Sequence, residues 1–140
     1  MRIVPILFTC AAMALCQAAV SPAFAAETDP LFVNATTDQP HRAEMELVFS
    51  KHQLDRKHPV TIFLSDRGVL IASKANQGKF KEQQELLGKL IAAGATVMAC
   101  SMCMEHYGVK EADLLAGIKI ANAQLIEGTL FKDNTKTLSW

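Results

Sequence analysis

The sequence predicts an α/β fold in which a mostly parallel sheet of about five strands carries helices on both faces. Two observations predict it: short apolar, β-branched runs recur along the chain, and segments of helical periodicity separate them. Strands separated by helices of this length are joined by right-handed crossovers and pair in parallel. In such sheets, ligands and catalytic groups gather at the carboxyl ends of the strands.

The first predicted strand is followed directly by the first predicted helix. Residues 31–36 form a compact apolar and β-branched run that suits a buried strand. Thr37, Asp38 and Pro40 then signal the start of a helix that extends to residue 57. Its apolar face is formed by four residues at helical spacing: Met45, Val48, Phe49 and His52.

The middle of the chain contains the clearest helix of the sequence. Residues 60–64 form a second β-rich strand, and residues 66–68 form a turn. Residues 69–72 either continue this strand or begin a lid-like segment. A stripe of leucine and isoleucine then runs through residues 79–93, and Gly94 follows where a left-handed cap is favoured.

The remaining elements are shorter. Residues 96–99 are predicted to be a strand, and residues 110–116 a helical turn or two ending at a glycine. Residues 118–120 form a further strand, and residues 123–131 another helix. Residues 135–140 alternate polar with apolar side chains, which favours an edge strand that closes the sheet.

The first 25 residues have the pattern of a signal peptide. Arg2 is followed by an apolar stretch over residues 3–19, and Ala23-Phe24-Ala25 offers a cleavage site of small residues. Residues 26–140 then form a single domain, without a second hydrophobic stretch of spanning length. We expect a periplasmic protein with no membrane attachment after cleavage.

Charge and cysteine content narrow the function further. The whole chain has a net charge of zero, and loss of Arg2 with the signal leaves 13 basic and 14 acidic residues. No nucleic-acid or other polyanionic partner is implied. Two of the four cysteines remain after cleavage, Cys100 and Cys103. An oxidising compartment drives such thiol pairs toward disulfides unless a reductant acts on them.

This cysteine pair is the predicted site. Cys100 comes at the carboxyl end of the strand over residues 96–99, and Cys103 falls in the first turn of the next helix. Both thiols then lie beside unpaired backbone N–H groups, which stabilise a thiolate, the form that a nucleophilic or sulfur-carrying cysteine needs. The plain alternative is an unreactive core cysteine with or without a structural disulfide.

Other uses of a Cys-x-x-Cys pair have further requirements. Haem attachment needs a histidine after the second cysteine, where this chain has Met104. A zinc knuckle needs a second cysteine pair, which residues 26–140 lack, although His106 offers a third ligand. Thioredoxin-type exchange relies on a proline that faces the dithiol later in the chain, and the last proline is Pro59.

Copper binding is a separate possibility. Three methionines interleave with the two cysteines and His106, and soft sulfur ligands suit Cu(I). These methionines are Met98, Met102 and Met104. The favoured interpretation is that methionines alternating along a strand and a helix start pack in the core.

Taken together, these residues resemble the DsrE/DsrF-like sulfur-relay family over most of residues 26–140. The segments that carry the resemblance are Asn34 to Thr37 with His41-Arg42, Pro59 to Leu64, Ala92 to Val97, the Cys100-x-x-Cys103-Met run, Gly108-Val109, Asp113 to Leu115, Gly117, Asn122 and Asp133 to Trp140. The resemblance implies a three-layer α/β/α fold and assembly into trimers or hexamers. It also implies a persulfide on Cys100 that is passed between a donor and an acceptor protein.

The additional thiol, Cys103, is then the expected resolving partner of Cys100 or half of a disulfide switch. His41 and His106 are candidates for tuning the thiol, and Asn122 either caps a helix or lines a pocket. No cofactor is expected. The leading hypothesis is a periplasmic persulfide carrier or thiol redox protein; the alternatives are a Cu(I) or zinc site at Cys100, Cys103 and His106, and a non-catalytic oligomeric interaction module.

Overall fold

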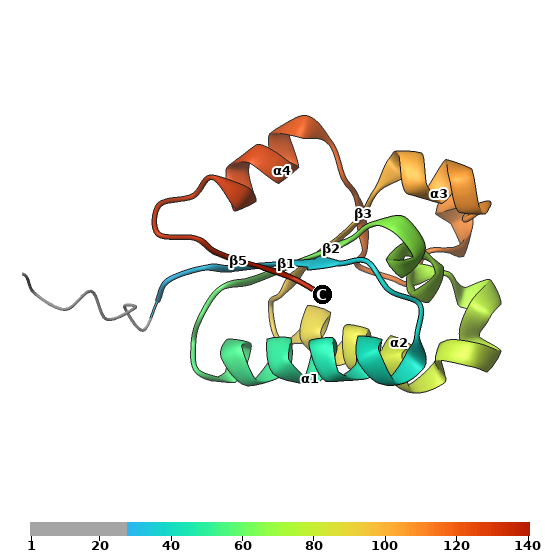
Figure 1. Cartoon of the computed structure of the whole chain (residues 1–140), viewed down its shortest axis with the longest axis horizontal. Helices are drawn as coiled ribbons and strands as arrows, with labels where there is room; N and C mark the ends of the chain where they lie inside the picture. The colour runs from blue at the N-terminus through green and yellow to red at the C-terminus, as the bar shows by residue number, and fades with distance from the viewer. Residues whose placement is uncertain (1–27) are drawn as a thin grey trace, which may run out of the picture.

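A computed structural model of the protein describes residues 28–140 and contains the predicted parallel sheet (Figure 1). Its five strands pair in parallel in the order β4-β3-β2-β1-β5. They are β1 (Leu31–Ala35), β2 (Val60–Leu64), β3 (Thr96–Ala99), β4 (Lys119–Ile120) and β5 (Lys136–Ser139). The prediction that the C-terminal segment forms an edge strand is confirmed, since β5 pairs with β1 at the end of the sheet.

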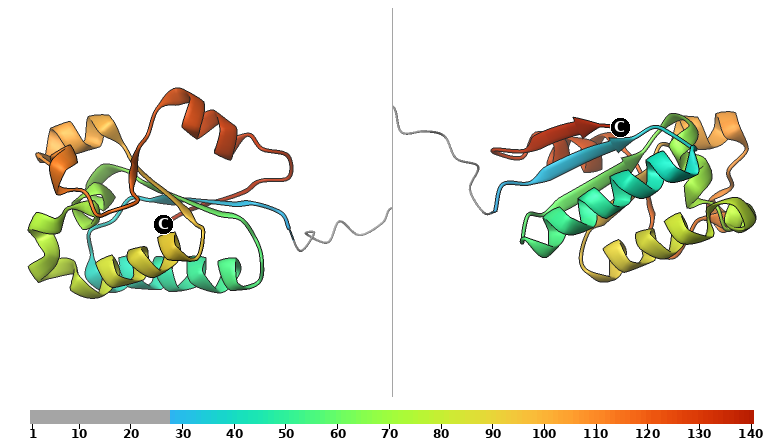
Figure 2. Two further views of the ribbon diagram at one scale, coloured as in Figure 1. Left: turned by 180° about the vertical axis from the view of Figure 1, so that it is seen from behind. Right: turned by 60° about the horizontal axis from the view of Figure 1, so that its bottom comes forward.

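Helices cover both faces of this sheet. The long helices α1 (Pro40–Asp55) and α2 (Gln77–Ala92) lie together on one face, and α4 (Ala123–Leu130) lies on the other (Figures 1 and 2). The short helix α3 (Ser101–Tyr107) follows β3 and packs beside the 3-10 helix η1 (Asp66–Ala72). Two further 3-10 turns are η2 (Lys74–Asn76) and η3 (Glu111–Asp113). The α/β/α architecture is therefore confirmed.

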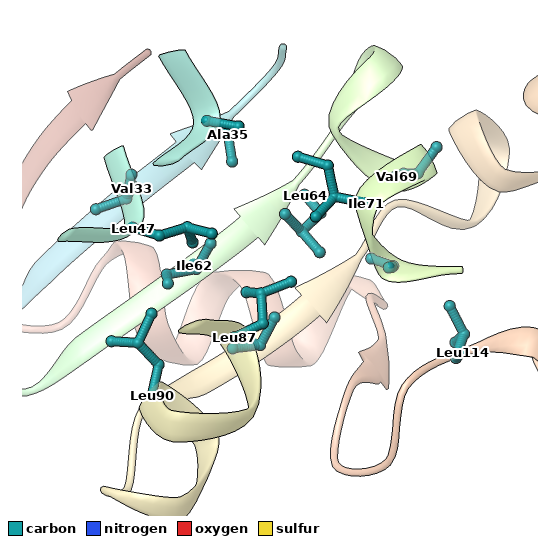
Figure 3. Packing of buried hydrophobic residues seen from close by; sticks show 14 of the residues in the cluster. Val33, Ala35, Leu47, Ile62, Leu64, Val69, Ile71, Leu87, Leu90 and Leu114 are labelled. Carbon is teal, nitrogen blue, oxygen red and sulfur yellow. The ribbon is translucent and has the colours of Figure 1, made fainter. Parts of the chain in front are cut away.

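The main hydrophobic core lies between the sheet and the α1 and α2 layer (Figure 3). Successive strand residues point to opposite faces, so Val33 and Ile62 face this layer while Phe32 and Met98 belong to a second, smaller cluster. That cluster is completed by partly buried side chains of α4: Leu125, Ile126 and Leu130. The hydrophobic cluster on the α4 face is therefore smaller than the core on the opposite face.

The predicted apolar face of α1 is not its buried face. Met45 and Phe49 are 38% and 37% exposed, and the buried residues of this helix are Ala43, Glu46, Leu47 and Ser50.

The structure also decides one alternative that the sequence left open and shortens one predicted helix. Residues 69–72 do not extend β2; they are the second half of η1, which folds across the carboxyl edge of the sheet. The helix predicted over residues 110–116 is reduced to η3, because Leu114 is extended and forms a bridge with Ser73. Buried contacts with distant segments decide both conformations, and local periodicity does not report such contacts.

The chain end that carries the predicted signal peptide, residues 1–25, lies outside the described residues. Within residues 28–140, no helix combines the length and the apolar character that a membrane span requires.

Candidate functional site

Cys100 lies where β3 ends and α3 begins, as predicted. Its backbone N–H still donates to the Leu64 carbonyl at 2.9 Å, which continues the β2–β3 pairing. Its own backbone is extended, so it acts as the N-cap of α3, and its Sγ accepts a hydrogen bond from the backbone N–H of Cys103 at 3.2 Å. The strand end and the helix start together fix the position of this sulfur.

Cys103, in the first turn of α3, is joined to Cys100 by a disulfide, with 5.2 Å between the two Cα atoms. Its sulfur also accepts a hydrogen bond, from the backbone N–H of Asp66 at 3.2 Å. Asp66 is the first residue of η1 and has a left-handed backbone with φ of 45°. Each sulfur of the pair therefore has a backbone N–H donor, and the two donors come from different elements.

The two sulfurs differ in exposure. Cys100 is 8% exposed and belongs to the main core, whereas Cys103 is half-buried. Cys103 opens into a shallow pocket of about 290 Å³, which is lined by Asp66, Met102, Cys103, His106 and Tyr107. Met102 is 78% exposed at its rim. A molecule that approaches the site from solvent therefore meets Cys103.

A set of polar contacts connects the wall of this pocket to η1. The Tyr107 hydroxyl donates to the carboxylate of Asp66, and this hydrogen bond raises the pKa of Tyr107 above its usual value. The guanidinium of Arg67 lies over the Tyr107 ring, 5.6 Å from its centroid. His106 contacts the same ring edge-on, with 4.7 Å between centroids. These contacts tie α3 to the start of η1.

Asp38 anchors the other side of η1. Arg67 donates two hydrogen bonds of 2.8 Å to the two carboxylate oxygens of Asp38, and the ammonium of Lys79 donates a third at 2.9 Å. The bond with Arg67 is the largest cause of a lowered pKa at Asp38. Because Arg67 follows Asp66 directly, this bidentate pair also restrains the peptide N–H that donates to Cys103.

The other predicted site residues lie in different places. His106 lines the pocket at Cys103. His41 is exposed as the second residue of α1 and does not line this pocket. Asn122 caps α4, because its side-chain oxygen accepts from the backbone N–H of Leu125 at 2.8 Å. Of the three tuning candidates, the structure brings His106 to the cysteine pair.

Two of the three methionines near the cysteines pack in the core, as favoured, whereas Met102 is 78% exposed. Met98 is fully buried on the α4 face of the sheet, and Met104 is 5% exposed in the main core, so the two lie in different clusters. Within residues 28–140, no group of three or more His, Cys, Asp or Glu side chains is arranged to hold a metal ion. Cys100, Cys103 and His106 therefore do not form a ready metal site in this arrangement.

Sequence reasoning missed Asp66, Arg67 and Tyr107 as parts of the site. A signal for the first two was present, because they follow the carboxyl end of β2, and β2 lies beside the strand that ends at Cys100. Tyr107 carries no such signal. Its place in the pocket depends on how α3 packs against η1, which the order of residues along the chain does not show.

Comparison with known proteins gives a consistent family match. Residues 31–134 match the DsrE/DsrF-like family. The chain is 35% identical over 111 residues to the uncharacterized protein MJ0989 of Methanocaldococcus jannaschii, an alignment that covers 76% of this chain and 97% of that protein.

Solved structures share the fold at low sequence identity. The ychN protein of E. coli has a TM-score of 0.61 at 15% identity, over 81% of this chain and 99% of its own. The protein of unknown function MTH1491 from Methanobacterium thermoautotrophicum has a TM-score of 0.65 at 14% identity, over 79% and 98% of the two chains. BT1422 from Bacteroides thetaiotaomicron scores 0.62 at 22% identity, over 80% and 95%.

Proposed function

The chain belongs to the DsrE/DsrF-like family, and from this premise we propose that it is an exported thiol protein that accepts sulfur as a persulfide on Cys100 and releases it with the help of Cys103. One observation carries the proposal: the two sulfurs are within bonding distance, and each accepts a backbone N–H. Such donors favour the negatively charged thiolate over the neutral thiol. The pair is therefore suited to nucleophilic sulfur chemistry when it is reduced.

In the first step, the Cys100 thiolate attacks the outer sulfur of a donor persulfide, R–S–SH. A new S–S bond forms on Cys100, the donor S–S bond breaks, and the donor leaves as the thiolate R–S⁻. The product is a persulfide, Cys100–S–SH. The N–H of Cys103 remains in place to hydrogen-bond the sulfur of Cys100 before and after this transfer.

In the second step, the Cys103 thiolate attacks the inner sulfur of this persulfide. The bond between Cys100 and Cys103 forms, the persulfide bond breaks, and HS⁻ leaves with the electron pair. The product is the disulfide of the present structure. Transfer of the outer sulfur to an acceptor protein competes with this step. Because Cys103 lies so close, release as sulfide is the faster route unless the acceptor is already bound.

Location and assembly belong to the same proposal. An exported protein meets the oxidising conditions under which a Cys100–Cys103 disulfide persists. We infer a homo-oligomer, a trimer or hexamer, that covers the α4 face of the sheet. A pocket of about 390 Å³ on this face is lined mainly by apolar side chains. Phe131, the residue that caps the C-terminus of α4, is a further apolar side chain that is 76% exposed. A sulfur donor and an acceptor are the further partners.

The Cys103→Ser variant tests the first step directly. We expect the reduced variant, after treatment with a small-molecule persulfide donor, to gain the mass of one sulfur atom on Cys100, because the resolving thiol is absent. The measurement is intact-protein mass spectrometry followed by peptide mapping. In the native protein the added sulfur should instead be lost as the disulfide closes.

Cys100→Ser is the matched control for this experiment, since it keeps Cys103 and alters the same disulfide. Persulfide that forms on Cys100 in Cys103→Ser and persists there longer than on the more accessible Cys103 in Cys100→Ser supports the carrier role. Equal mass gain in the double serine variant would remove it, because the sulfur would then be bound elsewhere.

A further inference from the structure

The two ends of the disulfide present different surfaces to solvent. Cys103 lines the open pocket together with Met102, His106 and Tyr107, whereas Cys100 is 8% exposed and packs in the main core. A thiolate opens a disulfide by approaching one sulfur along the extension of the S–S bond, so access selects the sulfur that is attacked. The pocket lies on the Cys103 side, and this makes Cys103 the accessible target.

The stability of the leaving thiolate also affects the rate of this reaction. Attack on Cys103 expels Cys100 as a thiolate, and Cys100 Sγ already accepts the N–H of Cys103 at 3.2 Å. A leaving thiolate that is stabilised by a hydrogen bond departs faster. Cys103 Sγ accepts the Asp66 N–H at the same distance of 3.2 Å, so these hydrogen bonds would stabilise either leaving thiolate. Access, which differs between the two sulfurs, therefore decides the direction of attack.

We propose that the disulfide is reopened by a dithiol protein reductant whose cysteine enters this pocket and attacks Cys103. This inference rests on the proposed function, since it supplies the step that returns the oxidised pair to the sulfur-accepting state. The partner thiolate forms a mixed disulfide with Cys103, the Cys100–Cys103 bond breaks, and Cys100 receives the electron pair. Cys100, the cysteine that accepts sulfur in the proposed function, is therefore the first thiolate released.

The cycle closes with a second attack. The reductant's other thiolate attacks its own sulfur in the mixed disulfide, so that the reductant becomes a disulfide and Cys103 leaves as a thiolate. Two electrons pass from the reductant to the pair. Two side chains of the pocket suit an incoming cysteine: the imidazole of His106 can accept the proton of the thiol, and Met102 offers an apolar contact at the rim.

Glutathione serves as the probe thiol for mapping the attack. The oxidised native protein is mixed with glutathione, quenched with acid at short times, alkylated and sequenced by tandem mass spectrometry. We expect glutathione on Cys103 and the alkylating reagent on Cys100. Glutathione on Cys100 would overturn the inference and leave the persulfide step on Cys100 intact.

Two reduced variants decide the result if the mixed disulfide closes again before the quench. We expect the thiol of Cys103 in Cys100→Ser to react with an aromatic disulfide reagent at least about tenfold faster than the thiol of Cys100 in Cys103→Ser, because the pocket admits the reagent to Cys103. Equal rates, or a faster Cys100, would contradict the inference. Failure of the proposed function has a different signature, namely no persulfide on Cys100 while Cys103 still reacts first.

Discussion

Replacing Gly68 by alanine should destabilise the protein severely. A Cβ at this position would lie 2.2 Å from the Ala35 carbonyl oxygen at the end of β1, far inside van der Waals contact. That oxygen cannot turn away freely, because it accepts the backbone N–H of Ser65 at 2.9 Å. The η1 segment must move off the edge of the sheet, at a cost of about 3 kcal/mol or more in unfolding free energy.

The measurement is chemical denaturation of Gly68→Ala beside Gly88→Ala. Gly88 lies within α2, where a Cβ meets nothing within 4 Å, so its replacement should stabilise the helix by about 0.5 to 1 kcal/mol. Displacement of η1 should also withdraw the Asp66 N–H from Cys103. An unfolding midpoint for Gly68→Ala equal to that of the native protein would show that η1 does not pack on Ala35 in this way.

Glu46 should make the protein less stable as the pH rises through neutrality. This residue of α1 is 1% exposed, and its Oε1 has no hydrogen-bond partner among the described residues. Burial raises the pKa of its carboxyl to about 8 from an ordinary value of 4.5, although Arg42 partly opposes the shift. The folded state therefore holds a proton that the unfolded state releases between these two values.

The sign of the effect follows from proton binding. Between about pH 4.5 and 8 the folded protein binds more protons at Glu46 than the unfolded chain, so the free energy of unfolding falls with rising pH. The loss across this window is on the order of 5 kcal/mol. Urea denaturation of the oxidised protein at several pH values measures it.

Glu46→Gln should abolish most of this slope, because the amide is uncharged at every pH in the window. Glu82→Gln is the matched control, since Glu82 lies on the exposed side of α2 and its removal should keep the slope of the native protein. Parallel stability curves for Glu46→Gln and the native protein between pH 5 and 8.5 would refute the buried, protonated state of Glu46.

Much of the fold could be predicted because strands and long helices carry local patterns. The apolar run of β2 and the leucine stripe of α2 are visible in the sequence, and Gly94 follows α2 with φ of 98°, as its predicted capping role requires. The segment Val69 to Ala72 is as apolar as a strand. It becomes part of η1 because Gly68 allows a close approach to β1, a long-range contact without a local signature.

In the candidate site too, the features with a local sequence pattern could be predicted and those that depend on long-range contacts could not. The place of Cys100 and Cys103 followed from the rule that strand ends carry function, and His106 was one helical turn away. The pocket wall was not predictable in full, because Tyr107 meets Asp66 across 41 residues of sequence. The difference in exposure between the two cysteines also depends on tertiary packing, since both lie in one short segment.

Sulfide release tests most directly whether Cys100 and Cys103 act together on sulfur. The reduced native protein is mixed with a persulfide donor, and free sulfide and the remaining protein thiols are counted over time. We expect one sulfide for each pair of protein thiols lost, and loss of this coupled release in Cys100→Ser and in Cys103→Ser. Sulfide release at the native rate from the double serine variant would contradict a role for the pair.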